Sequence, residues 1–381
     1  MNSRIPPQSL ATARRWCAPL LLLVLVPAAF AADKTPKQAR KAPVAVVAPV
    51  AEKRPLQHSD YDGWRSILSQ SLSPDGRFAV YGLFPQEGDG EVVVRDLQSG
   101  KEYRQAAGQR PAPPKPNYAS MEDEPPQQPK VTIAFTPDSK WVAFSTFPIK
   151  ADVEKAKRAK KSEEAPKGGM VIVNLLSGAA TRYERIKSFQ VPQETTAAGP
   201  LVMFLREPEK SSAAEDASKD DSAPAKGKKK QYGSELVLRH LDSGEELKFA
   251  DVTEFQLVKD GSGFVYAVSS KDESTNGVYA VFADMEKVPA KLVGGPGRYL
   301  KLSFDEPQKQ LAFLSDRDEA GAKKPRLKLY LWQRGATEAK ALASAETPGM
   351  KSGYLVSEKG SVTFSRDGQH IFFGCAHEHA L

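Results

Sequence analysis

One short pattern recurs along this 381-residue chain and constrains its fold more than any other feature. In each copy, a turn that contains an aspartate precedes a stretch in which apolar residues alternate with other residues. Five copies are present: "LSPDGRFAVYGL" (72–83), "FTPDSKWVAFST" (135–146), "LVKDGSGFVYAV" (257–268), "SFDEPQKQLAFLS" (303–315) and "FSRDGQHIFFGC" (364–375). Self-similarity of this kind indicates a fold that is built from repeated units.

A second pattern follows most copies of the first, and in it a strand-forming stretch runs into a polar turn and then a second strand. Its copies are "EVVVRDLQSGKEYR" (91–104), "MVIVNLLSGAATRY" (170–183), "ELVLRHLDSGEELKF" (235–249), "VYAVFADMEKVPAKLV" (278–293) and "LKLYLWQRGATEAKAL" (327–342). Asp-Gly and Ser-Gly supply the positive φ and the local hydrogen bonds of tight turns. The period of two places Phe78 and Val80, or Val142 and Phe144, on one sheet face.

Two successive hairpins make a four-stranded antiparallel sheet, and such a sheet repeated radially is a β-propeller blade. The aspartates Asp75 and Asp138 are 63 residues apart, whereas Asp138 and Asp260 are 122 apart. The doubled gap predicts a degenerate unit near 188–208, whose partner is the hairpin at 235–249. The sequence therefore predicts an all-β propeller with five complete blades and part of a sixth, incomplete or open.

Three inserted segments account for the length that blades of ~40–45 residues leave over. Residues 105–130 are Pro-rich, residues 150–169 combine helix formers with no apolar stripe, and residues 207–231 have low hydrophobicity and mixed charge. We expect disordered insertions at all three places. For 150–169, a solvated helix is the alternative to a mobile arm.

The N-terminus has the pattern of a secretory signal peptide. Arginines precede the apolar run "CAPLLLLVLVPAAFA", which closes on small residues at Ala31. An uncleaved anchor is the alternative, although a membrane span normally needs about 20 apolar residues. We expect a signal peptide at 1–31, an Ala/Pro/Lys-rich disordered linker at 32–54, and a propeller at 55–381. The protein is then periplasmic or secreted, without stable membrane insertion after cleavage.

The net charge of +7 is confined to the N-terminal segments. Residues 1–31 contribute three arginines and no acid, and residues 32–54 contribute six basic residues against two acids. Nothing of the excess remains for residues 55–381, so the folded region has no net field that would attract phosphates. We therefore expect no nucleic-acid partner.

Motifs for catalysis or cofactor binding are missing from the sequence. It contains no Gly-x-Ser-x-Gly, no H-E-x-x-H, no Walker lysine loop and no dinucleotide-binding Gly-x-Gly-x-x-Gly. The two cysteines, Cys17 and Cys375, make neither a disulfide framework nor a C-x-x-C motif. We predict no catalytic, cofactor-binding or metal-binding residue in this chain, and no cofactor.

For five smaller features, a structural interpretation is favoured over a functional one. His377 and His379 could contribute two ligands to a metal, which is too few for a site. The acidic run Glu122-Asp123-Glu124 is expected to be solvated, although it could hold a cationic substrate. The Asp-Gly pairs lack a calcium ligand ladder and are expected to be turns. Trp64 and Trp141 are expected to anchor blade cores, and Cys375 to lie in a strand.

The segments "SDYDGWRSILSQSLSPDGRFAVYGLFPQEGDGEVVVRDLQSGKEYR" (59–104) and "FTPDSKWVAFSTFPIKADVEKAKRAKKSEEAPKGGMVIVNLLSG" (135–178) resemble secreted bacterial peptidases of the prolyl oligopeptidase family. The resemblance covers most of 56–375 and fades through 195–232. It implies an N-terminal β-propeller that restricts access to a C-terminal α/β-hydrolase domain with a Ser-Asp-His triad. That domain is missing from this sequence, so no catalytic residue of the family can be assigned to a numbered position.

Two functional hypotheses follow. In the first, the chain is the non-catalytic, substrate-gating propeller of such a serine peptidase, truncated before the hydrolase domain. The terminal residues "HEHAL" are then the end of an interrupted reading frame, and we expect them to have no strand partner. In the second, the chain is a stand-alone periplasmic WD-like propeller that acts as a protein-binding scaffold. This second hypothesis needs an N-terminal strand from 56–70 to complete the last blade. The expected partner is accordingly a peptide substrate or another protein.

We predict that export removes residues 1–31, because the apolar run is too short to remain as an anchor. N-terminal sequencing of the protein recovered from the periplasm or medium should begin at Ala32. A membrane-bound protein that retains Met1 would contradict this prediction and favour the anchor.

Overall fold

The computed structural model describes residues 55–112, 128–159, 165–195, 197, 199–208, 232–283 and 288–378. The chain divides into two units, residues 1–55 and 56–381, and everything described except Pro55 belongs to the second. The predicted signal peptide and linker therefore lie outside the described residues. In the described part, no helix is long and apolar enough to cross a membrane.

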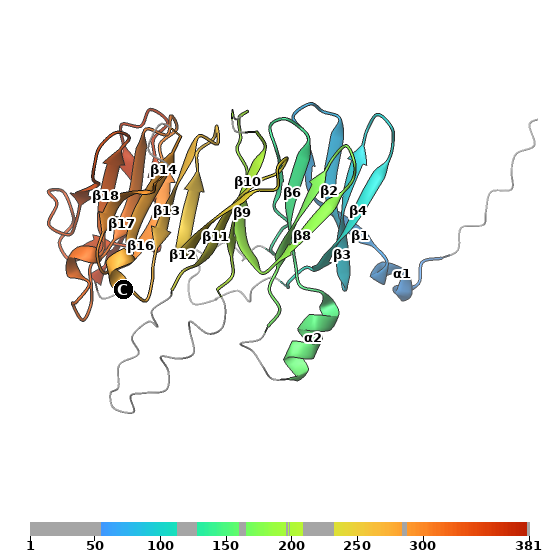
Figure 1. Ribbon diagram of the computed structural model, residues 1–381. Helices are drawn as coiled ribbons and strands as arrows, with labels where there is room; N and C mark the ends of the chain where they lie inside the picture. Colours follow the sequence, from blue (N-terminus) through green and yellow to red (C-terminus); the bar gives the residue numbers. More distant parts are fainter. Residues whose placement is uncertain are drawn as a thin grey trace, which may run out of the picture. The chain divides into compact units, whose positions relative to one another are not determined.

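The first two sheets each have four antiparallel strands in sequence order (Figure 1). A short helix, α1 (His58–Asp62), precedes the first sheet, which consists of β1 (Arg65–Leu72), β2 (Phe78–Pro85), β3 (Asp89–Asp96) and β4 (Glu102–Gln109). The second sheet consists of β5 (Ile133–Phe135), β6 (Trp141–Thr146), β7 (Gly169–Asn174) and β8 (Ala180–Glu184), with helix α2 (Lys150–Arg158) between β6 and β7.

A seven-stranded sheet in the middle of the chain is two blades joined through one strand. It contains β9 (Ile186–Gln190), β10 (Leu201–Arg206), β11 (Ser234–His240), β12 (Glu246–Leu257), β13 (Gly263–Val268), β14 (Gly277–Phe282) and β15 (Ala290–Gly294), with the short 3-10 helix η3 (Glu273–Thr275) before β14. The first half of β12 pairs with β11 and the second half with β13. Val252 pairs on both sides, directly after Asp251 with its left-handed φ of 57°. The strand bends there and ends one blade while it begins the next.

The fifth blade is a four-stranded sheet and is followed by two small sheets. The fifth contains β16 (Tyr299–Phe304), β17 (Gln310–Ser315), β18 (Lys328–Gln333) and β19 (Lys340–Ala343), with 3-10 helix η4 (Arg317–Glu319) after β17. Beyond it, β20 (Tyr354–Val356) pairs with β23 (Cys375–His377), and β21 (Thr363–Phe364) pairs with β22 (Ile371–Phe372). Among the described strands, no pairing joins these small sheets to the first sheet.

The fold predicted from the repeats is confirmed as five four-stranded blades of an open β-propeller and a partial sixth. The degenerate unit expected near 188–208 forms β9 and β10, and its predicted partner at 235–249 forms β11 and the first half of β12. Cys375 lies in a strand, as expected. The expectation that the terminal residues have no strand partner was wrong for His377, which pairs with Tyr354.

The Asp turns form because a side chain satisfies the backbone that tight turns leave unpaired. In the first blade, Ser73 Oγ donates to Asp75 Oδ1 at 2.5 Å, and Asp75 Oδ1 also accepts the Arg77 amide at 3.0 Å. The partial sixth blade repeats this arrangement with Ser365 and Asp367. The prediction that these aspartates form turns is therefore confirmed.

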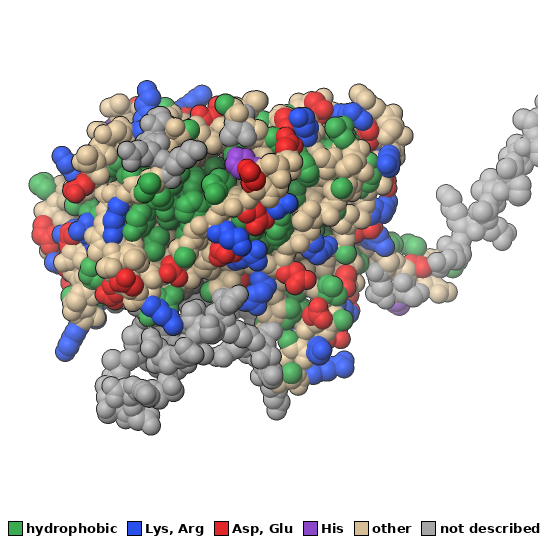
Figure 2. Space-filling view, viewed as in Figure 1, with side chains coloured by type: hydrophobic (Ala, Val, Ile, Leu, Met, Phe, Trp, Pro, Cys, Tyr) green, Lys and Arg blue, Asp and Glu red, His purple; other side chains and the backbone are tan. Residues whose placement is uncertain are grey.

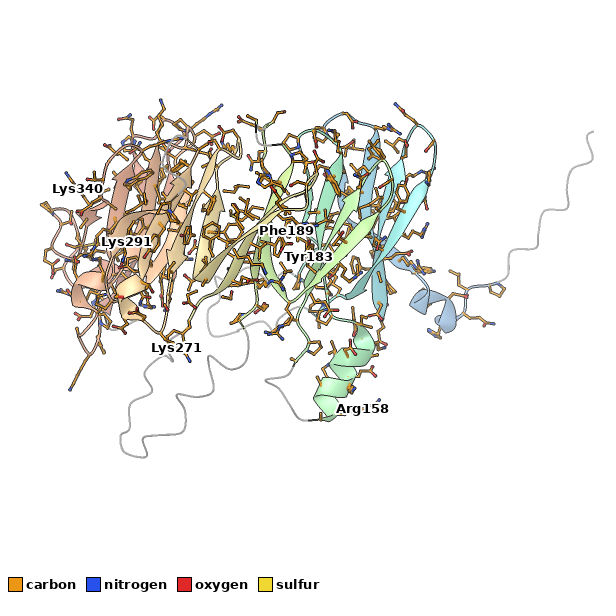
Figure 3. The ribbon with its side chains drawn as sticks, viewed as in Figure 1. Arg158, Tyr183, Phe189, Lys271, Lys291 and Lys340 are labelled. Carbon is orange, nitrogen blue, oxygen red and sulfur yellow. The ribbon has the colours of Figure 1, made fainter. Side chains whose placement is uncertain are left out.

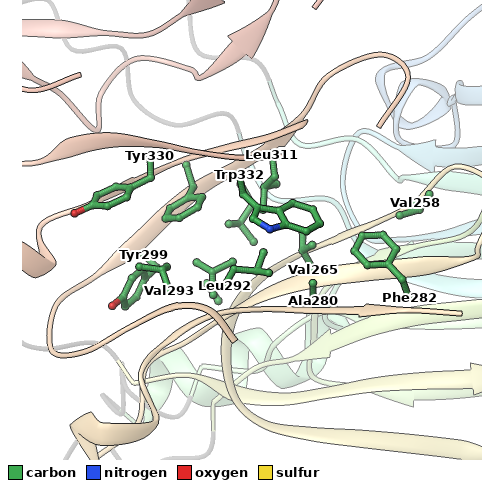
Figure 4. Close-up of a cluster of buried hydrophobic side chains, with 14 residues drawn as sticks. Val258, Val265, Ala280, Phe282, Leu292, Val293, Tyr299, Leu311, Tyr330 and Trp332 are labelled. Atoms are coloured by element: carbon green, nitrogen blue, oxygen red, sulfur yellow. The ribbon is translucent and has the colours of Figure 1, made fainter. Parts of the chain in front are cut away.

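The core consists of apolar clusters between successive sheets. Strand β2 alternates buried and partly buried residues along its full length, whereas β13 is buried on both faces because sheets cover it on either side. Figure 4 shows the cluster between the fourth and fifth blades, where Trp332 is fully buried. The Trp332 ring stacks on Phe282 with centroids 6.0 Å apart, and its Nε1 donates to the Ala336 carbonyl at 2.8 Å.

The two tryptophans that were predicted from the sequence to anchor blade cores differ in burial. Trp141 is partly buried and packs against the cluster around Phe204. Trp64 is 52% exposed and makes an edge contact with Tyr61, with centroids 4.8 Å apart, so its assignment to a blade core was wrong. Trp64 precedes β1, on a stretch where no neighbouring sheet is available to cover it.

Parts of the first two expected insertions form regular secondary structure. Strand β4 continues to Gln109 because its residues pair with β3 as far as Asp89, and residues 113–127 lie outside the described part. In 150–169, the helical alternative is confirmed by α2, none of whose residues is buried (Figure 3). Residues 209–231 of the third segment also lie outside the described part. The scaffold hypothesis needs a strand from 56–70 to complete the last blade, but residues 65–70 belong to β1 of the first sheet.

We predict that Trp332→Ala lowers the free energy of unfolding by about 3–5 kcal/mol, because it leaves a large cavity between two blades. Trp64→Ala is the matched control and should change it by less than about 1 kcal/mol. Urea unfolding followed by far-UV circular dichroism measures both. Equal losses for the two variants would contradict the assigned core.

Candidate functional site: the inner strands of the blades

The first strands of successive blades approach one another edge to edge. We call β1, β5, β9, the second half of β12, and β16 the inner strands. In the third to fifth blades, side chains of β9 reach the backbone of β12 and a side chain of β12 reaches the backbone of β16, which is the arrangement expected where propeller blades converge. The inner strands are therefore the place where residues from different blades can act together.

Gln190 joins the third and fourth blades. Its Oε1 accepts the Leu257 amide of β12 at 2.8 Å, and its Nε2 lies 3.5 Å from the Phe255 carbonyl and 3.4 Å from Gln256 Oε1. Lys187, on the same strand, donates to the Thr253 carbonyl at 3.2 Å. Strand β9 thus hydrogen-bonds to β12 through side chains.

Glu254 joins the fourth and fifth blades. Its Oε2 accepts the Lys301 amide at 2.8 Å and its Oε1 accepts the Leu302 amide at 2.9 Å. These amides are free to bond a neighbouring blade because β16 has a bulge there. Leu300 pairs with Leu314 and Ser303 with Ala312, which leaves two residues opposite one. Lys301 has a left-handed φ of 60°.

Opposing interactions act on the pKa of the Glu254 carboxyl group. Burial raises its pKa above the ordinary value of 4.5, while the amide bonds from Lys301 and Leu302 and the charges of Lys301 and Lys187 act in the other direction. Both carboxylate oxygens accept backbone hydrogen bonds, so this group links blades and has no oxygen left unengaged to act as a base toward a substrate.

Strand β1 has the same bulge as β16. Leu68 pairs with Gly82 and Ser71 with Val80, so two residues again lie opposite one, and Ser69 has a φ of 53°. Unlike the other inner strands, β1 exposes large apolar side chains. Ile67 is 61% and Leu72 62% exposed.

The face of the first sheet that carries Ile67 and Leu72 also carries an ion-pair cluster. Arg65 Nη1 lies 2.6 Å and Arg104 Nη1 2.8 Å from Glu91 Oε1, and Arg104 Nη2 lies 2.7 Å from Glu102 Oε2. Arg65, Glu91 and Arg104 line a shallow hollow, whose other lining residues include Leu83, Asp89 and Gly90. Exposed pairs of this kind contribute about 0–1 kcal/mol each, so they shape the surface more than they stabilise it.

The surface shown in Figure 2 carries both charge signs interspersed, and hydrophobic side chains gather over the region of β12 and β13. Phe249, Tyr266 and Tyr279 belong to this region and pack on one another, with Tyr266 and Tyr279 stacked at 5.4 Å. Arg158 lies at the end of α2, which stands away from the sheets (Figure 3).

Two of the aspartates in the repeat turns, Asp75 and Asp367, have a lowered pKa. Hydrogen bonds from Ser73 and the Arg77 amide lower the pKa of Asp75, and hydrogen bonds from Ser365 and the Gln369 amide lower that of Asp367. A carboxylate with a lowered pKa is a poor general base at neutral pH. These groups therefore act as turn caps.

The other residues that the sequence singled out do not form a site in the described structure. His377 makes an edge contact with Tyr354, with ring centroids 5.5 Å apart, and His379 lies outside the described residues. Glu122, Asp123 and Glu124 also lie outside them. In the described part of the chain, no group of three His, Cys, Asp or Glu residues could hold a metal ion.

Sequence reasoning missed Glu254 and Gln190. The available signal was a charged residue inside the otherwise strand-like "DVTEFQLV" (251–258), where an inner strand should carry few charges. Its partner amides lie 47 and 48 residues further along the chain and belong to backbone, which leaves no residue-type pattern to find.

Comparisons with known proteins give structural likenesses only. No family model matches the sequence, and no curated protein matches it either. Among solved structures, the β-propeller domain of the Trilobed protease from Pyrococcus furiosus, which has an open velcro topology, is 10% identical, with a TM-score of 0.39 over 83% of this chain and 78% of that domain. Prolyl oligopeptidase B from Galerina marginata is 12% identical, with a TM-score of 0.38 over 82% of this chain and 38% of that protein.

An oligogalacturonate lyase in complex with manganese is matched to a similar degree, at 16% identity and a TM-score of 0.39 over 80% of this chain and 72% of the lyase. Peptidases of the family that the sequence resembles are thus among the matched structures, and this chain spans less than half the length of prolyl oligopeptidase B. At these TM-scores the likenesses decide nothing about activity, and the strand pairing described above establishes the fold.

We predict that Glu254→Gln changes how stability depends on pH. A raised pKa in the folded state means that the folded protein binds the proton more tightly than the unfolded chain. The wild-type free energy of unfolding, relative to Glu254→Gln, should therefore fall as the pH rises from about 4.5 through the raised pKa, and then stay constant. Urea midpoints between pH 4 and 8 measure this difference.

The exposed Glu245→Gln is the control for this titration, since it sits in a surface turn on the preceding blade. A wild-type advantage over Glu254→Gln that grows with pH would contradict the raised pKa. A stability difference between the wild type and Glu254→Gln that does not change with pH would also contradict the raised pKa.

Proposed function

We propose that this chain is the substrate-gating propeller region of an exported serine peptidase of the prolyl oligopeptidase type. The observation that carries the proposal is the run of five complete blades, the last three of them bonded to one another through their inner strands, in a sequence whose segments 59–104 and 135–178 resemble that family. The signal-peptide pattern at residues 1–31 supports a periplasmic or secreted location.

In this role the propeller selects substrates by access. Blades that converge at their inner strands leave a passage whose width is set by side chains, so extended peptides pass where folded proteins are excluded. The inner strands offer a positive charge and amide groups, such as Lys187, Gln190 and Gln256, which suits passage of varied peptides without tight binding. Peptide substrates are the partners of this proposal.

The nucleotide sequence after the codon for Leu381 tests the truncation. A frame, continuous or shifted, that encodes a Gly-x-Ser-x-Gly domain would support it. Joining that domain to this chain should give a peptidase that cleaves short peptides and spares folded proteins, and deleting residues 55–381 should remove this size limit. An unchanged size limit after the deletion would overturn the gating role.

We predict that the purified chain hydrolyses neither prolyl peptide nor ester substrates, because none of the family's catalytic motifs is present in its sequence. Chromogenic peptide assays and labelling with a serine-directed fluorophosphonate, with a known serine peptidase as positive control, measure this. Specific labelling of the chain would contradict the prediction. A soluble, exported chain with no peptidase encoded downstream would favour the stand-alone scaffold instead.

A further inference from the structure

The bulges of β1 and β16 are two copies of one structure, and only one copy is filled. In both strands two residues lie opposite a single partner, and the first of the two has a left-handed φ: Ser69 at 53° and Lys301 at 60°. In β16, the two bulge amides bond the carboxylate of Glu254 from the preceding blade. The molecule itself therefore shows which chemical group this bulge accepts.

At β1 the corresponding amides belong to Ser69 and Gln70. The matching register and φ turn them out of the sheet as in β16. Among the described residues, no side chain accepts a hydrogen bond from either amide. Two adjacent outward-turned backbone N–H groups bind a carboxylate well, because each of its oxygens takes one of them.

The apolar side chains on either side of the β1 bulge are not covered by a neighbouring blade. Ile67 and Leu72 are more than three-fifths exposed on the two sides of the bulge, whereas the apolar residues of β16 on the same side pack into the neighbouring blade. The charges on this face balance, since Arg65, Arg95 and Arg104 lie among Glu91, Glu102 and Asp89, so only the paired amides of the bulge select for a carboxylate. Apolar exposure next to vacant backbone donors is the signature of an edge that receives another chain.

We infer that the β1 bulge and its exposed face bind an extended segment of a partner polypeptide that presents a glutamate carboxylate to the amides of Ser69 and Gln70. The bound segment lies along β1 in the same way that the second half of β12 lies along β16. Its apolar residues pack against Ile67 and Leu72. Binding at this surface requires neither a hydrolase domain nor peptidase activity.

The chain supplies its own probe, because residues 250–258, "ADVTEFQLV", are the segment that fills the equivalent site at β16. A fluorescent peptide of this sequence should bind the purified protein in an anisotropy titration. The same peptide with Glu254→Gln should bind about tenfold more weakly, because a charged acceptor of two amides becomes a neutral acceptor of one. Amide NMR shifts of Ser69 and Gln70 should move with the first peptide.

Ile67→Glu places a negative charge at the proposed site on a largely exposed position, so it should weaken binding of the peptide without unfolding the protein. Leu176→Glu is the matched control, at 60% exposure on the second blade, and should leave binding unchanged. Both variants are checked for wild-type circular dichroism and melting. Ser69→Pro, which forbids the positive φ, should also abolish binding if it folds.

Three outcomes would overturn the inference. The first is no binding of the peptide at millimolar concentration, and the second is equal binding of the glutamate and glutamine peptides. The third is self-association of the wild-type chain that Ile67→Glu abolishes, in analytical ultracentrifugation, which would assign the face to a second copy of this chain instead of a different partner.

Discussion

Neighbouring blades in this chain are held together chiefly by apolar side chains between their faces, and every other feature depends on that contact. A four-stranded sheet has two faces, and it cannot bury both by itself. Each blade therefore needs its neighbours, and the buried clusters around Val94, Phe204, Phe264 and Trp332 lie one after another along the array. Hydrogen bonds across the inner strands then set the register in which the faces meet.

This division of roles explains why polar groups appear at the inner strands at all. Glu254 and Gln190 each occupy backbone groups that a bulge or a strand edge leaves without a ladder partner. A buried backbone N–H without an acceptor costs about as much as a lost hydrogen bond, so the side chain is needed wherever the ladder is interrupted. Each of these side chains bonds the backbone of the blade that follows its own, so each hydrogen bond joins one particular pair of neighbouring blades.

The sequence predicted the blades well because their signals are local. Asp-containing turns and alternating strands lie within about a dozen residues, and the degenerate third blade was recoverable from spacing alone. Trp64 and the last residues were misjudged for a different reason. Whether a tryptophan is covered, or whether His377 finds Tyr354 as a partner, depends on contacts between distant segments. The hydrogen bonds from backbone amides to Glu254 could not be predicted for the same reason, because any residue can supply a backbone amide and no sequence pattern marks it.

The bend at Asp251 has a consequence for how the molecule comes apart. Elsewhere in the described chain a blade ends and the next begins on a separate strand, so one blade can loosen while its neighbour stays folded. The third and fourth blades share β12, and Val252 pairs with both β11 and β13. In a chain of units coupled to their nearest neighbours, this pair behaves as one double-length unit with a single opening equilibrium. Amide exchange in the two blades would then be synchronised, and their junction has no loop in which evolution could place an insertion.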